Sequence, residues 1–238
     1  MRPPFPEHYL ITPEPAAYGE ITARDTDLSS QRFLKDLDAS LSAGIKLVQL
    51  RSKVLTPIAF AALAKQAAIL CHQVDARLIL NGALDAWESA EKNFVEAERL
   101  ASVPASVSNG VPFDTALQAE IDALNADGIH LSSAQLMRCS QRPLHRGQWV
   151  SAACHTSADL QQAVTLQLDF VTLSPVLPTA THPDAEPLGW ERFAALSRAV
   201  TIPIFALGGM HAADKMLAQS YGAHGIAAIR SLWVRKPD

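Results

Sequence analysis

Short apolar segments alternate along this chain with longer amphipathic ones. The apolar segments have the length and composition of strands that are buried on both faces. We expect eight strands, at residues 9–12, 46–51, 77–81, 128–131, 149–154, 169–173, 203–207 and 225–229.

The amphipathic segments predict the helices between these strands. Gly44 ends the first helix, and Pro57 stands near the first turn of the second, as is typical of helix ends and starts. We expect helices at residues 29–43, 57–74, from about 134, 156–166, 189–199 and 212–221.

Repeated strand–helix units predict parallel strands. Eight such units favour a single (β/α)8 TIM barrel, and an open doubly wound sheet is the alternative. The length of 238 residues is near the roughly 250 that are typical of one barrel, although two small domains would also fit. We therefore expect one barrel domain over residues 1–238.

Two segments interrupt the alternation. The first is a predicted insertion after the third strand, at about 85–124, with helices at 85–101 and 114–124 and an exposed loop at 103–112. The second is residues 174–188, SPVLPTATHPDAEPL, whose four prolines cannot continue a strand. Because it follows a strand, we expect this loop at the active-site end of the barrel.

Composition narrows the class of function. Apolar residues make up 48% of the chain, the net charge is −4, and no basic run suggests nucleic acid or a membrane surface as partner. A small molecule is the expected partner. Cys71, Cys139 and Cys154 are widely spaced, which favours reduced thiols. Without an evident signal peptide or membrane-spanning run, we expect a cytoplasmic protein.

The first candidate for chemistry is Gly208-Gly209, directly after the seventh predicted strand. Two glycines there let the backbone approach an anion, and this is a common phosphate position in barrels. Ile229, Arg230 and Ser231 after the eighth strand would supply the other half, with a helix after Ser231 directing its positive end at the anion. The alternative is a tight turn that needs positive φ.

The second candidate is Gln49, Arg51 and Lys53, which alternate with period two and so share one face at the end of the second strand. Such a polar triplet is costly inside a barrel unless it meets solvent or an anion. The alternative is a solvated strand end with ion pairs.

Two histidines follow strands in the same way. His155 comes directly after the fifth strand and is a candidate acid/base group; the alternative is a cap of the next helix. His130 lies at the end of the fourth strand.

The proline-rich loop carries Thr179, Thr181 and His182, which can close over an anionic substrate or form an ordinary turn. Asp127 is either a metal ligand or, as single carboxylates before glycine more often are, a turn residue.

Taken in order, these motifs resemble the thiamine-phosphate synthase and TenI family. The resemblance covers nearly all of the chain except the insertion. It rests on YLIT (9–12), VQLRSK (48–53), LILN (78–81), ADGIHL (126–131), CHT (154–156), DFVTLSPVLPTATH (169–182), LGW (188–190), PIFALGGM (203–210) and GAHGIAAI (222–229).

The resemblance implies a (β/α)8 barrel that acts in thiamine biosynthesis. The synthase joins a pyrimidine pyrophosphate to a thiazole phosphate, uses Mg²⁺ and releases pyrophosphate. By resemblance, Gln49, Arg51, Lys53 and Asn81 surround the pyrimidine pyrophosphate, and Thr179 and Thr181 lie in the phosphate-binding loop. Gly208, Gly209 and residues 229–231 would hold the thiazole phosphate.

The chain departs from the synthase pattern in the pyrimidine half. The family's two Mg²⁺-binding aspartates correspond to Gly82 and Gln135, so both expected carboxylate ligands are absent. His182 replaces the lysine of Thr-x-Thr-Lys, and Ala153 stands where the serine two positions before the strand-five histidine is expected. We therefore expect no metal site among these residues.

This asymmetry resembles TenI more than the synthase. TenI proteins bind thiazole phosphate without making thiamine phosphate, and some isomerise the thiazole carboxylate with a histidine that matches His155. Three hypotheses follow: a synthase, a thiazole tautomerase that uses His155, or a non-catalytic phosphate binder. Residues 175–193 look like the synthase-like domain fused behind a Nudix hydrolase in some bacteria, which suggests a functional link to such an enzyme. Monomer and homo-oligomer both remain open.

Overall fold

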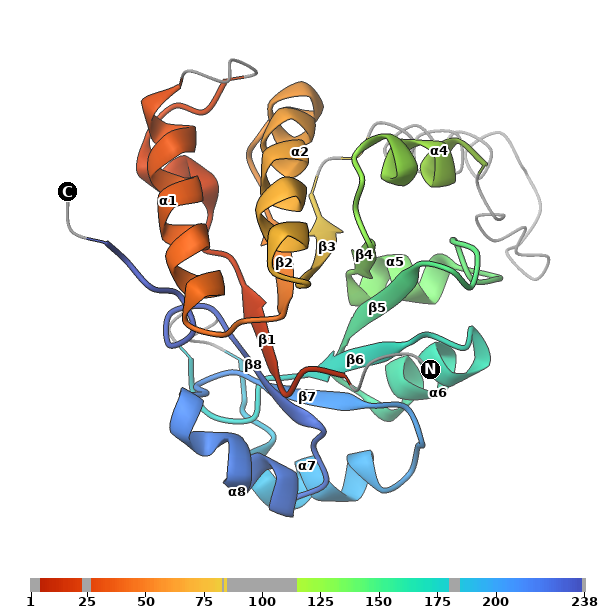
Figure 1. Ribbon diagram of the computed structural model, residues 1–238. Helices are drawn as coiled ribbons and strands as arrows, with labels where there is room; N and C mark the ends of the chain where they lie inside the picture. Colours follow the sequence, from red (N-terminus) through yellow and green to blue (C-terminus); the bar gives the residue numbers. More distant parts are fainter. Residues whose placement is uncertain (1–4, 23–26, 83, 85–114, 180–184, 237–238) are drawn as a thin grey trace.

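The computed structural model describes residues 5–22, 27–82, 84, 115–179 and 185–236. Within them, eight parallel strands close into a barrel in the order β1 to β8, with β1 paired to β8. Helices lie outside the strands (Figure 1). Closure confirms the predicted (β/α)8 barrel and makes the open doubly wound sheet wrong.

The strands lie within a residue or two of the predicted ones. They are β1 His8–Ile11, β2 Leu47–Arg51, β3 Arg77–Asn81, β4 Gly128–Leu131, β5 Trp149–Cys154, β6 Phe170–Leu173, β7 Ile204–Leu207 and β8 Gly225–Ala228.

The helices also follow the predicted order. They are η1 Pro15–Tyr18, α1 Leu28–Ser42, α2 Pro57–Gln73, α4 Thr115–Ala123, α5 Ser133–Arg138, α6 Ser157–Thr165, α7 Gly189–Ser197, η2 Ala212–Asp214 and α8 Lys215–Ser220. The segment predicted as one helix at 212–221 begins as a 3-10 turn, η2, before α8.

The predicted helix at 114–124 is present as α4, and it connects β3 to β4 in the chain. Leu117 and Ile121 of α4 are fully buried in the hydrophobic core. This part of the predicted insertion therefore fills the place of a barrel helix. The predicted helix at 85–101 and loop at 103–112 lie outside the described residues.

Two layers of apolar side chains hold the barrel. One lies between strands and helices. The other fills the barrel interior, where Tyr9, Trp149, Phe170 and Phe205 pack ring against ring. Phe5 stacks on Trp149 with ring centroids 4.6 Å apart. The interior is thus a packed core, and the cavity that the described residues form lies toward the carboxyl ends of the strands, as is usual for TIM barrels.

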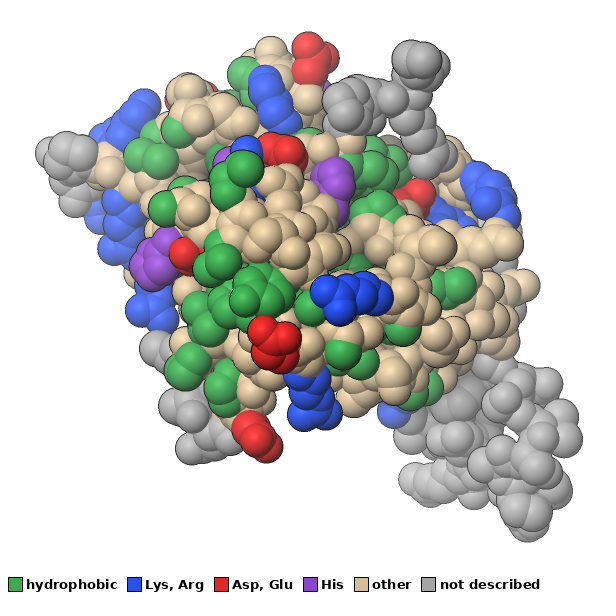
Figure 2. Space-filling model, turned by 90° about the horizontal axis from the view of Figure 1, so that it is seen from below, with side chains coloured by type: hydrophobic (Ala, Val, Ile, Leu, Met, Phe, Trp, Pro, Cys, Tyr) green, Lys and Arg blue, Asp and Glu red, His purple; other side chains and the backbone are tan. Residues whose placement is uncertain are grey.

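The three cysteines form no disulfide with one another. Cys71, Cys139 and Cys154 are buried and free, and burial raises the pKa of the Cys71 and Cys139 thiols to about 12. None of the described helices combines the length and apolar character needed to cross a bilayer. Acidic and basic side chains are interspersed with hydrophobic ones on the face seen from below (Figure 2).

Candidate functional site

The barrel mouth holds a cavity of about 480 Å³ at the carboxyl ends of the strands. Most of the predicted substrate residues line it together, although they come from separate strands and loops. These are Gln49, Arg51, Lys53, Asn81, His130, His155 and Thr179. The predicted residues Thr181 and His182 lie outside the described residues.

A second hollow of about 260 Å³ adjoins this cavity and shares Thr179, Leu207, Gly208 and Ile229 with it. The predicted phosphate residues Gly208, Gly209, Ile229, Arg230 and Ser231 all line this hollow. Met210 and His211, which the sequence did not single out, line it as well. The two predicted halves of the site are therefore neighbours.

Gly208 and Gly209 have backbone φ angles of +97° and +69°, which residues other than glycine rarely adopt. A Cβ at Gly208 would lie 2.8 Å from Cα of Pro175, and one at Gly209 would lie 2.9 Å from the carbonyl oxygen of Pro178. Both glycines are thus required by the turn itself and by the close approach of the proline-rich loop. The interpretation of Gly208-Gly209 as a tight turn is correct. The same turn also brings backbone to the surface of the second hollow.

The prediction of a helix after Ser231 is wrong. Residues 230–232 form a turn, and the chain continues without helical structure to residue 236. The Ser231 hydroxyl donates to the Met210 carbonyl oxygen at 2.9 Å and so ties the ends of β7 and β8 together. Positive charge at the second hollow comes from the Arg230 side chain rather than from a helix end.

A hydrogen-bonded chain of three side chains reaches the cavity, which Gln49 and Asn81 line. Gln49, 1% exposed, donates to the Tyr9 hydroxyl at 2.8 Å and accepts from the Asn81 amide at 3.1 Å. Burial raises the pKa of Tyr9 far above its usual value, so the phenol remains neutral. Gln49 and Asn81 are held in fixed orientations, whereas Lys53 is exposed at the rim.

His130 lies within β4 and is nearly buried. Its Nδ1 lies 2.8 Å from the Ser151 hydroxyl oxygen. Burial, and secondarily the charge of Arg51, lowers the pKa of His130 to about 3. The ring is therefore neutral near pH 7, and it can contact a ligand by hydrogen bonding but not as a cation.

His155 sits at the cavity wall in a defined orientation. Its backbone N–H donates to Asp159 Oδ2 at 2.9 Å, and its Nδ1 lies 2.8 Å from the carbonyl oxygen of Ser174. A carbonyl oxygen only accepts, so Nδ1 carries the proton and a neutral ring has its lone pair on Nε2. The N-cap of α6 is Thr156, so the alternative that His155 caps this helix is wrong.

Thr172 of β6 lines the cavity and was not predicted from the sequence. It is fully buried, and its hydroxyl has no hydrogen-bond partner among the described residues. A buried hydroxyl without a partner costs on the order of 1–3 kcal/mol. A polar group of a bound ligand would remove this cost.

The comparisons with known proteins agree with this geometry. The family model described as thiamine monophosphate synthase matches residues 20–100 and 103–232. The chain belongs to the thiamine monophosphate synthase family. It is 30% identical over 225 residues to a putative thiamine-phosphate synthase 2 of Aquifex aeolicus, covering 94% of this chain and 96% of that one.

A second curated relative and a solved structure are also similar to this chain. A putative thiamine-phosphate synthase of Geobacter sulfurreducens is 29% identical over 232 residues, covering 97% of this chain and 87% of that one. The solved structure of thiamine phosphate pyrophosphorylase from Pyrococcus furiosus superimposes with a TM-score of 0.59 at 17% identity, covering 94% of this chain and 85% of that one. That structural likeness shows the shared fold.

The residues present do not fit the Mg²⁺ site that the synthase family implies. Gln135 forms a capping box with Ser132 at the start of α5. A Cβ at Gly82 would lie 2.4 Å from the ring of Phe60, so a carboxylate there requires the buried ring to move. No carboxylate is found among the described residues that line either hollow.

Asp127 lies at the opposite end of the barrel from the mouth. Its carboxylate accepts from Arg77 at 2.5 Å and from the Leu78 backbone N–H at 2.8 Å, and it lies 3.0 Å from Nε2 of His72. The turn-residue interpretation is thereby favoured over the metal-ligand one. Within the described residues, no group of three or more His, Cys, Asp or Glu side chains is arranged to hold a metal ion.

Proposed function

We propose that this protein binds a thiazole phosphate at the barrel mouth and that His155 moves a proton on the bound ring, as a TenI-type thiazole tautomerase does. The observation that carries the proposal is the orientation of His155, whose Nδ1 lies 2.8 Å from the Ser174 carbonyl oxygen. This contact leaves Nε2 as the basic nitrogen at the cavity that adjoins the second hollow.

The second hollow suits the phosphate of such a ligand. The turn at Gly208-Gly209 brings backbone to the cavity surface, and Arg230 supplies a guanidinium that can form charge-assisted hydrogen bonds with phosphate oxygens. The size of the two hollows, about 480 and 260 Å³, is in keeping with a ring in the first and a phosphate in the second.

Proton transfer needs only groups that the chain supplies. Nε2 takes a proton from one atom of the ring system and becomes the imidazolium nitrogen, and the same nitrogen then returns a proton to a different atom. Atoms and charge balance over the two steps, without a metal or a second substrate. The Ser174 carbonyl oxygen accepts from Nδ1–H throughout and stabilises the imidazolium.

Synthesis of thiamine phosphate is the less favoured function. Gly82 and Gln135 provide no anionic ligand for Mg²⁺, and Phe60 occupies the space that a carboxylate at position 82 would need. Four residues of the pyrimidine half remain, Gln49, Arg51, Lys53 and Asn81, and two of them, Gln49 and Asn81, hydrogen-bond each other.

The proposal predicts separate effects on chemistry and binding for His155→Asn. The asparagine amide can still donate to the Ser174 carbonyl oxygen but offers no base. We expect isomerisation of thiazole phosphate carboxylate, followed by NMR, to fall by about 100-fold or more, while the Kd for thiazole phosphate changes less than about threefold. His145→Asn, on an exposed loop, is the matched control. Undiminished turnover in His155→Asn, or none in the wild type, would sink the tautomerase proposal.

A further inference from the structure

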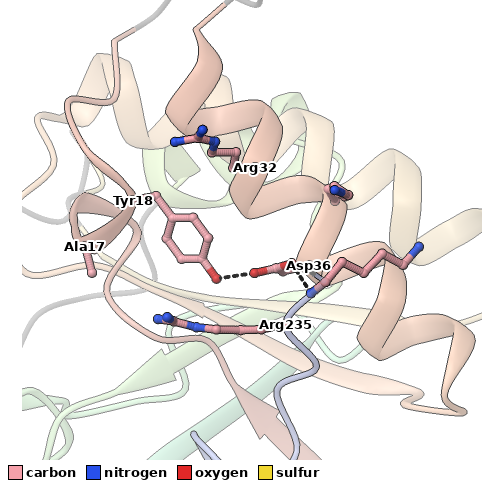
Figure 3. Close-up of a pocket in the computed structure, with 7 residues that line it drawn as sticks. Ala17, Tyr18, Arg32, Asp36 and Arg235 are labelled. Atoms are coloured by element: carbon pink, nitrogen blue, oxygen red, sulfur yellow. Dashed lines mark hydrogen bonds between the residues drawn. The ribbon is translucent and has the colours of Figure 1, made fainter. Parts of the chain in front are cut away.

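A separate cavity of about 560 Å³ lies outside the barrel, between η1, α1 and the C-terminal segment 233–236. Ala17, Tyr18, Arg32, Lys35, Asp36, Arg235 and Lys236 line it (Figure 3). None of these residues lines the two hollows at the barrel mouth. Binding here is therefore not part of the proposed thiazole site.

Basic side chains predominate among the described residues that line the cavity. Four of its side chains, Arg32, Lys35, Arg235 and Lys236, are cationic, and Asp36 alone is acidic among the described lining residues. The whole chain, in contrast, has a net charge of −4. A concave surface lined by one sign of charge concentrates counter-ions of the opposite sign.

The carboxylate of Asp36 is engaged by the wall of the cavity. Asp36 is 5% exposed; its Oδ2 accepts from the Tyr18 hydroxyl at 2.6 Å and its Oδ1 from the Lys236 backbone N–H at 2.9 Å. The Lys236 ammonium is directed to Asp38 instead, at 3.9 Å. Asp36 thus holds the C-terminal segment on α1. Both of its carboxylate oxygens accept a hydrogen bond from these two donors.

Aromatic packing makes the wall rigid. The indole N–H of Trp233 donates to the Tyr18 hydroxyl at 2.8 Å, and the rings of Tyr18 and Trp233 both pack on buried Phe33, with centroids 5.5 and 5.1 Å away. The Arg235 guanidinium carbon lies 5.6 Å from the centre of the Tyr18 ring. Such stacking limits the conformations of a guanidinium before any ligand binds.

Arg32 and Arg235 lie on opposite sides of the Tyr18–Asp36 hydrogen bond (Figure 3). Guanidinium groups in such a pair can each bind phosphate oxygens in a bidentate manner, and Lys35 adds a further positive charge at the same cavity. The cavity is within the range of about 300–1,000 Å³ that is usual for small-ligand sites.

From this geometry we propose that the cavity is a second anion site, which binds a small diphosphate or a metabolite carrying a diphosphate group. Recognition rests on Arg32, Lys35 and Arg235, with Tyr18 and Asp36 as the preorganised wall. The site is independent of the mouth and of the function proposed for it.

The test is a calorimetric titration of the full chain with sodium pyrophosphate at fixed ionic strength. The variant Lys35→Gln/Arg235→Gln removes two charges from the cavity. Its matched control, Lys65→Gln/Arg192→Gln, removes two charges from exposed positions on α2 and α7. We expect saturable binding in the wild type and the control, and an at least tenfold higher Kd in the cavity variant. Thiazole phosphate binding at the mouth should be the same in all three proteins.

Three results would overturn the proposal. The first is a Kd for pyrophosphate in the cavity variant within twofold of the wild type, or no saturable binding at all. The second is equal weakening in the control, which would show a nonspecific charge effect. The third is loss of all pyrophosphate binding in Arg51→Gln, which would assign the ion to the mouth. Thermal denaturation of each variant checks folding, and pyrophosphate should raise the Tm of the wild type but not of the cavity variant.

Discussion

Among single residues, Thr172 offers a direct test of ligand binding at the mouth. Its buried hydroxyl has no hydrogen-bond partner in the part of the chain that the structure describes, and Thr172 lines the cavity. We expect Thr172→Val to raise the free energy of unfolding by about 1 kcal/mol, because the variant removes an unsatisfied hydroxyl with little change of shape. The same variant should weaken thiazole phosphate binding if a ligand atom bonds this hydroxyl. Urea unfolding and calorimetry measure the two effects.

Ser151→Ala provides the contrast for Thr172→Val. The Ser151 hydroxyl donates to the Ile129 carbonyl oxygen at 3.3 Å and lies 2.8 Å from Nδ1 of His130. Its removal leaves a buried ring nitrogen without this partner, so the variant should be less stable than the wild type. A Thr172→Val protein that is also destabilised would show that the Thr172 hydroxyl has a stabilising partner in the free protein.

Site residues could be predicted from the sequence only where their spacing along a strand determines which face their side chains share. Gln49, Arg51 and Lys53 alternate along a strand, and the structure brings all three to one cavity. Thr172 and Tyr9 look like ordinary strand residues, because threonine and tyrosine are common in strands of any role. Their participation in the site depends on the cross-barrel neighbours, which the sequence does not reveal.

At the scale of elements, α6 and the strand before it depend on one carboxylate. Asp159 accepts from the backbone N–H groups of His155 and Thr156, each at 2.9 Å, and from the Ser133 hydroxyl at 2.8 Å. Burial alone would raise the pKa of Asp159, but these hydrogen bonds outweigh it and the pKa lies below its usual value. Asp159 thereby positions the candidate base and links α5 to α6.

Since the pKa of Asp159 is lower in the folded state, its charged form stabilises the fold above pH about 4 and this contribution is lost as the pH falls through the folded pKa. We expect Asp159→Asn to reduce the free energy of unfolding at pH 7 by about 1 kcal/mol, because neutral acceptors bond more weakly than charged ones. The difference from wild type should shrink toward pH 3. Urea unfolding at both pH values tests this, and a difference of equal size at pH 3 would contradict it.

Element positions were largely predictable because strands and helices differ in hydrophobic period. The segments at 77–81, 128–131 and 149–154 agree with β3, β4 and β5 in both bounds. The helix expected after Ser231 was wrong, because it was inferred from the phosphate sites of similar barrels rather than from a periodic pattern. The segment at 212–221 had the right period, but η2 at its start is a 3-10 turn that periodicity does not distinguish.

At the scale of the whole molecule, the barrel separates two basic regions. The mouth gathers residues from the carboxyl ends of the strands, whereas the outer cavity is formed by η1, α1 and the C-terminal segment. Closure of the barrel could be predicted because eight strand–helix units match a (β/α)8 barrel, whereas open doubly wound sheets usually have fewer. The outer cavity could not, since it requires the C-terminal segment to lie on α1 through Asp36 and Ser40, contacts that join residues about 200 positions apart.

Binding of a thiazole phosphate at the mouth should need no metal. Calorimetric titration of the wild-type protein with thiazole phosphate, in the presence of EDTA and again with Mg²⁺, is the decisive experiment. We predict saturation at one ligand per chain with the same Kd in both buffers, and an at least tenfold higher Kd for Arg230→Gln than for the control Lys65→Gln. Absence of saturable binding at millimolar ligand, or binding that appears only with Mg²⁺, would contradict the claim.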